Sequence, residues 1–171
     1  AQQVASAIAS TTLEVTQSAT EWSRLGYAMS DALELAEQSA IYSKVGATGI
    51  DVATENLTAT LQAFYSDDIR DGIITASDAA EEIVDKLVNV GDKFASSAEG
   101  MGQGISAAGS ALIAANNSLD ESLALITAGT TILQDESETA SALRTISLRL
   151  RGTKAKELEE AGLDAEGAIE D

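Results

Sequence analysis

Proline is absent from all 171 positions of this chain. It is the residue that most strongly interrupts helices, because it lacks a backbone N–H and clashes with the preceding turn. Helices can therefore end only at the thirteen glycines and at capping side chains. We predict an all-α fold of about seven or eight helices joined by short turns capped by Gly, Ser or Asp. The sequence leaves open whether these helices form a compact bundle or a helical array.

Capping patterns place the ends of the individual helices. Ser118 with Glu121 has the spacing of a capping box, and Asp135 with Glu138 repeats it. Ser77 and Asp78 are expected to begin an earlier helix. Together with the glycines, these signals predict helices at 4–18, 21–45, 51–66, 78–94, 103–116, 119–133, 136–151 and 154–161.

Apolar residues recur at helical spacing in the two best-defined helices. Leu119, Leu123 and Ile126 form one face of the helix at 119–133, and Leu143, Ile146 and Leu150 form one face of the helix at 136–151. We predict that the two helices pack as an antiparallel hairpin through these six residues, which would then be the packing core of this region.

The segment that contains this hairpin resembles a known family. The run SLDESLALITAG, the turn QDES, the helix ALRTISLRLRG and the run KELEEAGLD are similar to the core region of tail tape measure proteins from long-tailed bacteriophages or prophages. The strongest marker is Leu143–Gly152. The resemblance covers roughly Trp22–Leu163, and further segments that resemble successive helices of the family are Gly46–Phe64, Ala79–Phe94 and Gly104–Asn116.

The resemblance implies a structural role, since the family has no catalytic motif to carry over. The parent protein would run inside the tail tube, help to set tail length and leave during DNA delivery. It would be located in the virion tail, and in the host cytoplasm during assembly, with the tail tube protein and tail assembly chaperones as partners. Two alternatives from other classes remain: an acidic helical binding or adhesion module of a secreted or surface protein, and, more remotely, a carboxylate-dependent hydrolase.

Composition suggests a division into parts. Every aromatic residue lies in the first 94 positions, so the later core must use aliphatic and small residues. Gly and Ser are concentrated between these two regions. We predict an N-terminal helical part at 1–95, a Gly/Ser-rich joint at 96–103 and a C-terminal helical part at 104–171 that includes the tape-measure-like segment 118–163.

Several function classes lose their usual chemistry here. The chain has no cysteine and no histidine, which removes thiolate metal sites and the commonest general base. No nucleophile–base pair is recognisable, and we expect neither enzymatic activity nor a cofactor. The net charge of −18 opposes sequence-specific nucleic acid binding, because an acidic surface repels phosphates.

No apolar run approaches the roughly 20 residues that a membrane span needs, so we expect no membrane insertion by this segment. The chain begins AQQVASAIAS, without methionine or a signal peptide pattern. We expect this end to be a cut or processed position inside a longer protein.

One acidic stretch partly imitates a calcium loop. Residues 67–78 span twelve positions, with Asp67 first, Asp71 fifth and Asp78 last, in partial agreement with an EF-hand. Ile69 occupies the third position and cannot ligate a metal, and Asp78 stands where the bidentate ligand is normally Glu. An acidic turn between helices is the favoured interpretation, and we expect no tight calcium binding.

Basic residues are concentrated late in the chain. None occurs between Lys93 and Arg144, and five of the ten then follow within a short segment. A solvated helix face is the simpler interpretation, because exposed ion pairs contribute little. The alternative is a contact surface for an acidic neighbour such as another copy of the chain, because arginine is favoured at interfaces. Its candidate residues are Arg144, Leu148, Arg149, Arg151 and Lys154.

Overall fold

The computed structural model describes residues 12–94 and 97–152. Within these ranges the chain is helical and contains no strand, which confirms the all-α prediction. The expected helix at 154–161 and most of the one at 4–18 lie outside the described residues. The helices are α2 Thr12–Arg24, α3 Met29–Val45, α4 Ile50–Phe64, α5 Ser66–Arg70, α6 Ala76–Lys93, α7 Ala98–Ile113, α8 Leu119–Leu133 and α9 Glu136–Gly152.

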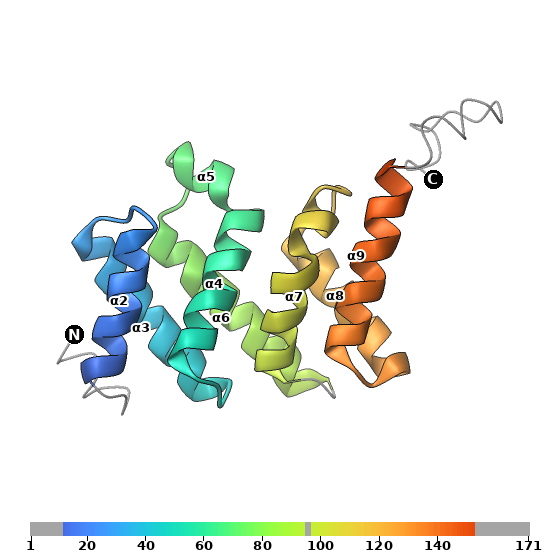
Figure 1. Ribbon diagram of the computed structural model, residues 1–171, viewed down its shortest axis with the longest axis horizontal. Coiled ribbons are helices and arrows are strands. Elements are labelled where there is room, and N and C mark those ends of the chain that lie inside the picture. Colours follow the sequence, from blue (N-terminus) through green and yellow to red (C-terminus); the bar gives the residue numbers. More distant parts are fainter. Residues whose placement is uncertain (1–11, 95–96, 153–171) are drawn as a thin grey trace.

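The helices form a two-layered array that progresses along the long axis of the molecule in chain order (Figure 1). One layer contains α2, α4, α7 and α9, and α3, α6 and α8 lie behind it. A helix of the first layer is followed in the chain by a helix of the second, so antiparallel pairs recur about every 40 residues, a length typical of helical repeats. Of the two arrangements that the sequence left open, the structure has the array.

A single apolar core runs through the array. It extends from Val15 in α2 to Ala140 in α9. Its largest side chains in the first half are Trp22 and Tyr42, whereas after α6 it contains only Met, Ile, Leu and Ala side chains. None of the described helices has the length and apolar character needed to cross a membrane.

The predicted capping box is present at the start of α8. The Ser118 backbone N–H donates to Glu121 Oε2 over 2.7 Å, and the Glu121 N–H donates to Ser118 Oγ over 3.3 Å. At the start of α9, the Glu138 N–H donates to Asp135 Oδ1 over 2.8 Å. The start of α6 corrects the prediction, because the cap is Thr75, whose hydroxyl accepts from the Asp78 N–H over 3.1 Å.

The predicted helix at 21–45 is two helices in the structure. Gly26 has φ +101° and reverses the chain between α2 and α3. The reversal is held by packing, since the rings of Trp22 and Tyr27 meet edge to face at 5.6 Å. Trp22 Nε1 donates to Ser39 Oγ over 3.1 Å across the α2/α3 pair. The sequence marks this turn only by one glycine, which is a weak signal by itself.

The predicted Gly/Ser-rich joint is largely helical. Ser97 caps α7 by accepting from the Gly100 N–H over 2.9 Å, so the helix begins at Ala98 and not at 103. The glycines of this segment are accommodated in a helix because neighbouring side chains fill the space that a Cβ atom would occupy. At Gly102 that space is taken by the Tyr42 hydroxyl. The core is continuous across α7, and the division into parts 1–95 and 104–171 stays a prediction.

The buried face of α9 differs from the predicted one. Ile146 is 52% exposed and Leu143 only partly buried, and the side chain of Leu150 lies outside the described residues. The helix buries Thr139, Ala140 and Ser147 instead. These small side chains let α9 pack closely on α7 and α8, so backbone proximity, and not the size of the apolar residue, selects the face. Leu119, Leu123 and Ile126 of α8 are buried.

Two isoleucines provide a matched test of this packing. Ile126 is fully buried, and its methyl groups lie 3.2–3.3 Å from the position that a Cβ on Gly104 would take. Ile126→Ala should lower the free energy of unfolding by roughly 2–5 kcal/mol, as other buried aliphatic truncations do. Ile146→Ala removes the same atoms from an exposed position and should cost much less. Urea denaturation of both variants measures the difference, and equal losses would show that the buried faces are misassigned.

Gly102 tests how closely the Tyr42 side chain of α3 packs against α7. Gly102→Ala raises helix propensity by about 1 kcal/mol, but its Cβ would collide with the Tyr42 hydroxyl. We expect net destabilisation, and a smaller loss when Gly102→Ala is introduced into a Tyr42→Phe protein. At Gly100 the nearest atom is the mobile carboxylate of Glu136, so Gly100→Ala should cost less than Gly102→Ala. Thermal unfolding of the four variants checks this, and a fully stable Gly102→Ala protein would contradict it.

Candidate interaction surface

The predicted basic surface lies on the last described helix of the array. α9 packs on α7 and α8 and forms the end of its layer (Figure 1). Arg144 and Arg149 are exposed, and Leu148 is 49% exposed. The side chain of Arg151 and all of Lys154 lie outside the described residues. The structure therefore exposes three of the five candidate residues on one helix and does not describe the side chains of the other two.

The side of α9 that faces away from the array is mixed in chemistry. Glu138, Ala142, Thr145 and Arg149 recur at spacings of three and four, and all four are exposed. Such spacing places them along one face of a helix. Arg144 is nearer to the side that packs on the array. The outward side of α9 therefore differs from the surface suggested by the sequence, and it has an acid, Glu138, at one end and an arginine, Arg149, at the other.

Two basic residues outside α9 form ion pairs. Arg70 forms ion pairs with Asp67 at 2.7 Å and Asp71 at 3.1 Å. Lys86 pairs with Glu82 at 3.0 Å and with Asp120 at 2.9 Å, which links α6 to α8. Within residues 12–94 and 97–152, by contrast, neither Arg144 nor Arg149 has an ion pair.

Exposed apolar side chains accompany this charge. In α8, Leu125 is 39% exposed, Ile132 81% and Leu133 44%, and in α9 Ile146 and Leu148 are each about half exposed. The α8/α9 hairpin therefore carries several large apolar groups in contact with solvent.

A groove between α6 and α8 was not found from the sequence. It has a volume of about 560 Å³, and Val90, Phe94, Leu123 and Ala128 contribute apolar surface to it. The side chain of Phe94 is 53% exposed because α6 ends at Lys93. Only the separation of two helices opens this groove, and no local sequence pattern reports such a separation.

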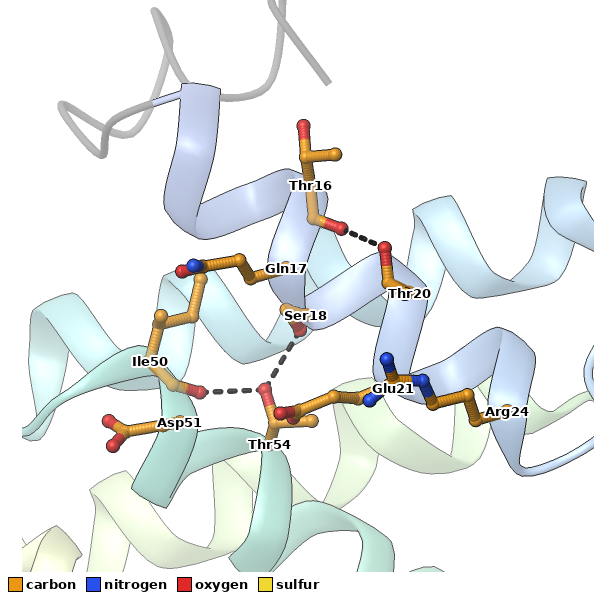
Figure 2. A pocket seen from close by; sticks show the side chains of 9 residues that line it. All are labelled: Thr16, Gln17, Ser18, Thr20, Glu21, Arg24, Ile50, Asp51 and Thr54. Carbon is orange, nitrogen blue, oxygen red and sulfur yellow. Dashed lines mark hydrogen bonds between the residues drawn. The ribbon is translucent and has the colours of Figure 1, made fainter.

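A second groove lies between α2 and the beginning of α4 (Figure 2). It has a volume of about 420 Å³. Its hydroxyl groups are engaged within the protein: the hydroxyls of Ser18 and Thr54 are 2.8 Å apart, and those of Thr20 and Thr54 donate to the carbonyls of Thr16 and Ile50 over 2.7 and 2.6 Å. The hydroxyls of Thr20 and Thr54 thus bond backbone carbonyls, and the Ser18 hydroxyl bonds that of Thr54.

The acidic stretch 67–78 does not assemble a cage of carboxylates in the described residues. Asp67 and Asp71 both pair with Arg70, and α5 occupies the first part of the stretch. Asp78 belongs to the first turn of α6. No group of three or more acidic side chains suited to a metal ion occurs in the part of the chain that the structure covers. The weak binding expected for calcium stays a prediction.

Tyr42 of α3 is an ionisable side chain that is fully buried. Its hydroxyl donates to the Ala98 carbonyl over 2.8 Å and joins α3 to the start of α7. Burial raises the pKa of Tyr42 to about 12. A Cβ atom on Gly102 would contact both the Tyr42 hydroxyl and the amide nitrogen of Asn56, so these two groups lie near each other. The Asn56 amide nitrogen has no hydrogen-bond partner among the described residues.

The pKa of Tyr42 predicts an alkaline loss of stability. The native state holds this proton more tightly than the unfolded chain, whose tyrosine pKa is about 10. The stabilising contribution is therefore complete below pH of about 10 and is lost as the pH rises towards 12. The free energy of unfolding should fall across this range, and less steeply in Tyr42→Phe. Tyr27 and Tyr65 titrate in both proteins, so identical pH dependence would contradict the assignment to Tyr42.

Comparison with known proteins gives one family. A family model described as phage-related minor tail protein matches residues 1–171. Neither a curated protein nor a solved structure matches the chain.

Proposed function

This chain belongs to the family of phage-related minor tail proteins, and on that premise we propose that it is a segment of a tail tape measure protein. The observation that carries the proposal is the hairpin of α8 and α9 with its capping box and QDES turn, because these are the residues that resemble the tape measure core. The family match supports a structural role in a phage tail and leaves the finer assignment to experiment.

The architecture suits a structural element of this kind. The described helices follow one another along one axis (Figure 1). The chain is strongly acidic, with a net charge of −18, and an acidic protein that shares a channel with DNA would not adhere to the passing phosphates. These properties support a component that occupies the tail tube and later leaves it.

We further propose the location and partners that such a role requires. The parent protein would lie in the lumen of the tail tube in the virion, and in the host cytoplasm during assembly. The tail tube protein would surround it, and tail assembly chaperones would bind it before the tube is complete. Its extent would contribute to tail length.

Altering the length of the segment in the phage that encodes it tests the proposal. Tails should become shorter when residues 12–152 are deleted in frame, by at most about 210 Å, the length of that segment as a continuous helix at 1.5 Å per residue. A tandem duplication should lengthen them and remains informative if the deletion blocks assembly. Electron microscopy of purified tails provides the measurement.

A replacement of equal length separates extent from sequence. Exchanging residues 12–152 for an unrelated helical segment of the same length should keep the tail length of any tails that form. Tails of unaltered length in both the deletion and the duplication would contradict the proposed role in length determination, while leaving membership of the tail protein family intact.

A further inference from the structure

The outward face of α9 carries a charge pattern that is complementary to itself. Glu138 and Arg149 lie at its two ends, Ala142 and Thr145 lie between them, and all are exposed. In the described part of the chain, neither Glu138 nor Arg149 forms a side-chain ion pair, although four such pairs occur elsewhere. Among the described residues the face therefore has no ion-pair partner, and it has opposite charges at symmetric positions.

We propose that two copies of the chain associate through this face, with their α9 helices antiparallel about a two-fold axis near residues 143 and 144. Glu138 of each copy then lies opposite Arg149 of the other. Because the axis relates the two contacts, one complementary pair of residues forms twice. Ala142 and Thr145 lie nearest the axis, where their small side chains permit the two helices to approach.

Charge complementarity favours a second copy as the occupant of this face. Each of α4 and α7 has neighbours on both sides in its layer, whereas α9 ends the described layer (Figure 1). The chain is acidic overall, and a surface rich only in acids would satisfy Arg149 but repel Glu138. A second α9 satisfies both. The half-exposed Leu148, next to Arg149, adds apolar contact at the edge of the pair.

The contact is small, so the association is weak. α9 has 17 residues, and one pair of helices this long buries less than the roughly 1,000 Å² typical of stable interfaces. Each chain also has a net charge of −18. Salt near 0.1 M limits the reach of that repulsion to about 10 Å, whereas salt near 1 M shortens the Debye length to about 3 Å and weakens the ion pairs themselves. Dimers should form at high protein concentration and moderate salt.

Charge reversal tests the pairing by sedimentation equilibrium. Glu138→Arg and Arg149→Glu should each lower the association constant roughly tenfold, because two attractive contacts become repulsive at once. The double variant E138R/R149E exchanges the charges and preserves their complementarity, so it should dimerise like the unaltered chain. An equimolar mixture of the two single variants should also associate, since each supplies what the other lacks.

Arg144→Glu is the matched control, because it makes the same charge change on the same helix away from the outward face. It should weaken association less than Arg149→Glu does. Circular dichroism confirms that these exposed variants fold. A chain that stays monomeric at high concentration, a double variant as weak as the single ones, or equal effects of Arg144→Glu and Arg149→Glu would overturn the proposal.

Cross-linking locates the axis independently. The chain has no cysteine, so Ala142→Cys places a single thiol beside the proposed two-fold axis, and oxidation should give a disulfide-linked dimer. Ala128→Cys places a thiol at an exposed position of α8 and should cross-link much more slowly. Equal cross-linking rates for the two variants would exclude the proposed arrangement.

Discussion

The array depends on how closely α7 approaches its neighbours. Four glycines of this helix lie against four different side chains: Glu136 of α9 at Gly100, Tyr42 of α3 at Gly102, Ile126 of α8 at Gly104 and Phe64 of α4 at Gly109. A glycine inside a helix costs about 1 kcal/mol relative to alanine. Here the missing Cβ atoms leave room for side chains from four other helices against one thin helix, and the apolar burial that results offsets that cost. The two ends of the array are joined through α7.

Local signals predict the helices better than they predict the packing. The Ser118/Glu121 capping box and the Asp135 cap are formed by atoms three residues apart, so sequence alone identifies them. The turn at Gly26 and the helix cap at Thr75 depend on equally local chemistry. Neither is easily recognised in the sequence, because Gly26 is a single glycine and Thr75 is one of two nearby hydroxyl residues that could cap the helix. Helical propensity also places the glycines of α7 in a joint, whereas tertiary contacts stabilise them as a helix.

The packing faces show why side-chain size is a poor guide to this core. The spacing of large apolar residues predicts that Ile146 is buried, but the smaller residues Ala140 and Ser147 of α9 face inward instead. Burial favours large apolar groups only where there is space for them. Against a glycine-rich partner, close backbone approach and dispersion contacts from many small groups compete with that preference. As a result, both Ile146 and Leu148 lie at the surface. The sequence predicted Ile146 to be in the core and Leu148 to be in a contact surface.

This rotation of α9 connects the core to the candidate surface. Because Ala140 and Ser147 face inward, Glu138, Thr145 and Arg149 must face outward. In a helix, the orientation of one face fixes the orientation of the opposite face. Basic composition revealed that the segment was unusual, but the face that it presents follows only from the packing of its other side on α7 and α8. Among the described helices, α9 has a neighbour in its own layer on one side only, whereas α7 has neighbours on both sides. The surface available for contacts is therefore a consequence of the same small-residue packing that holds the array together.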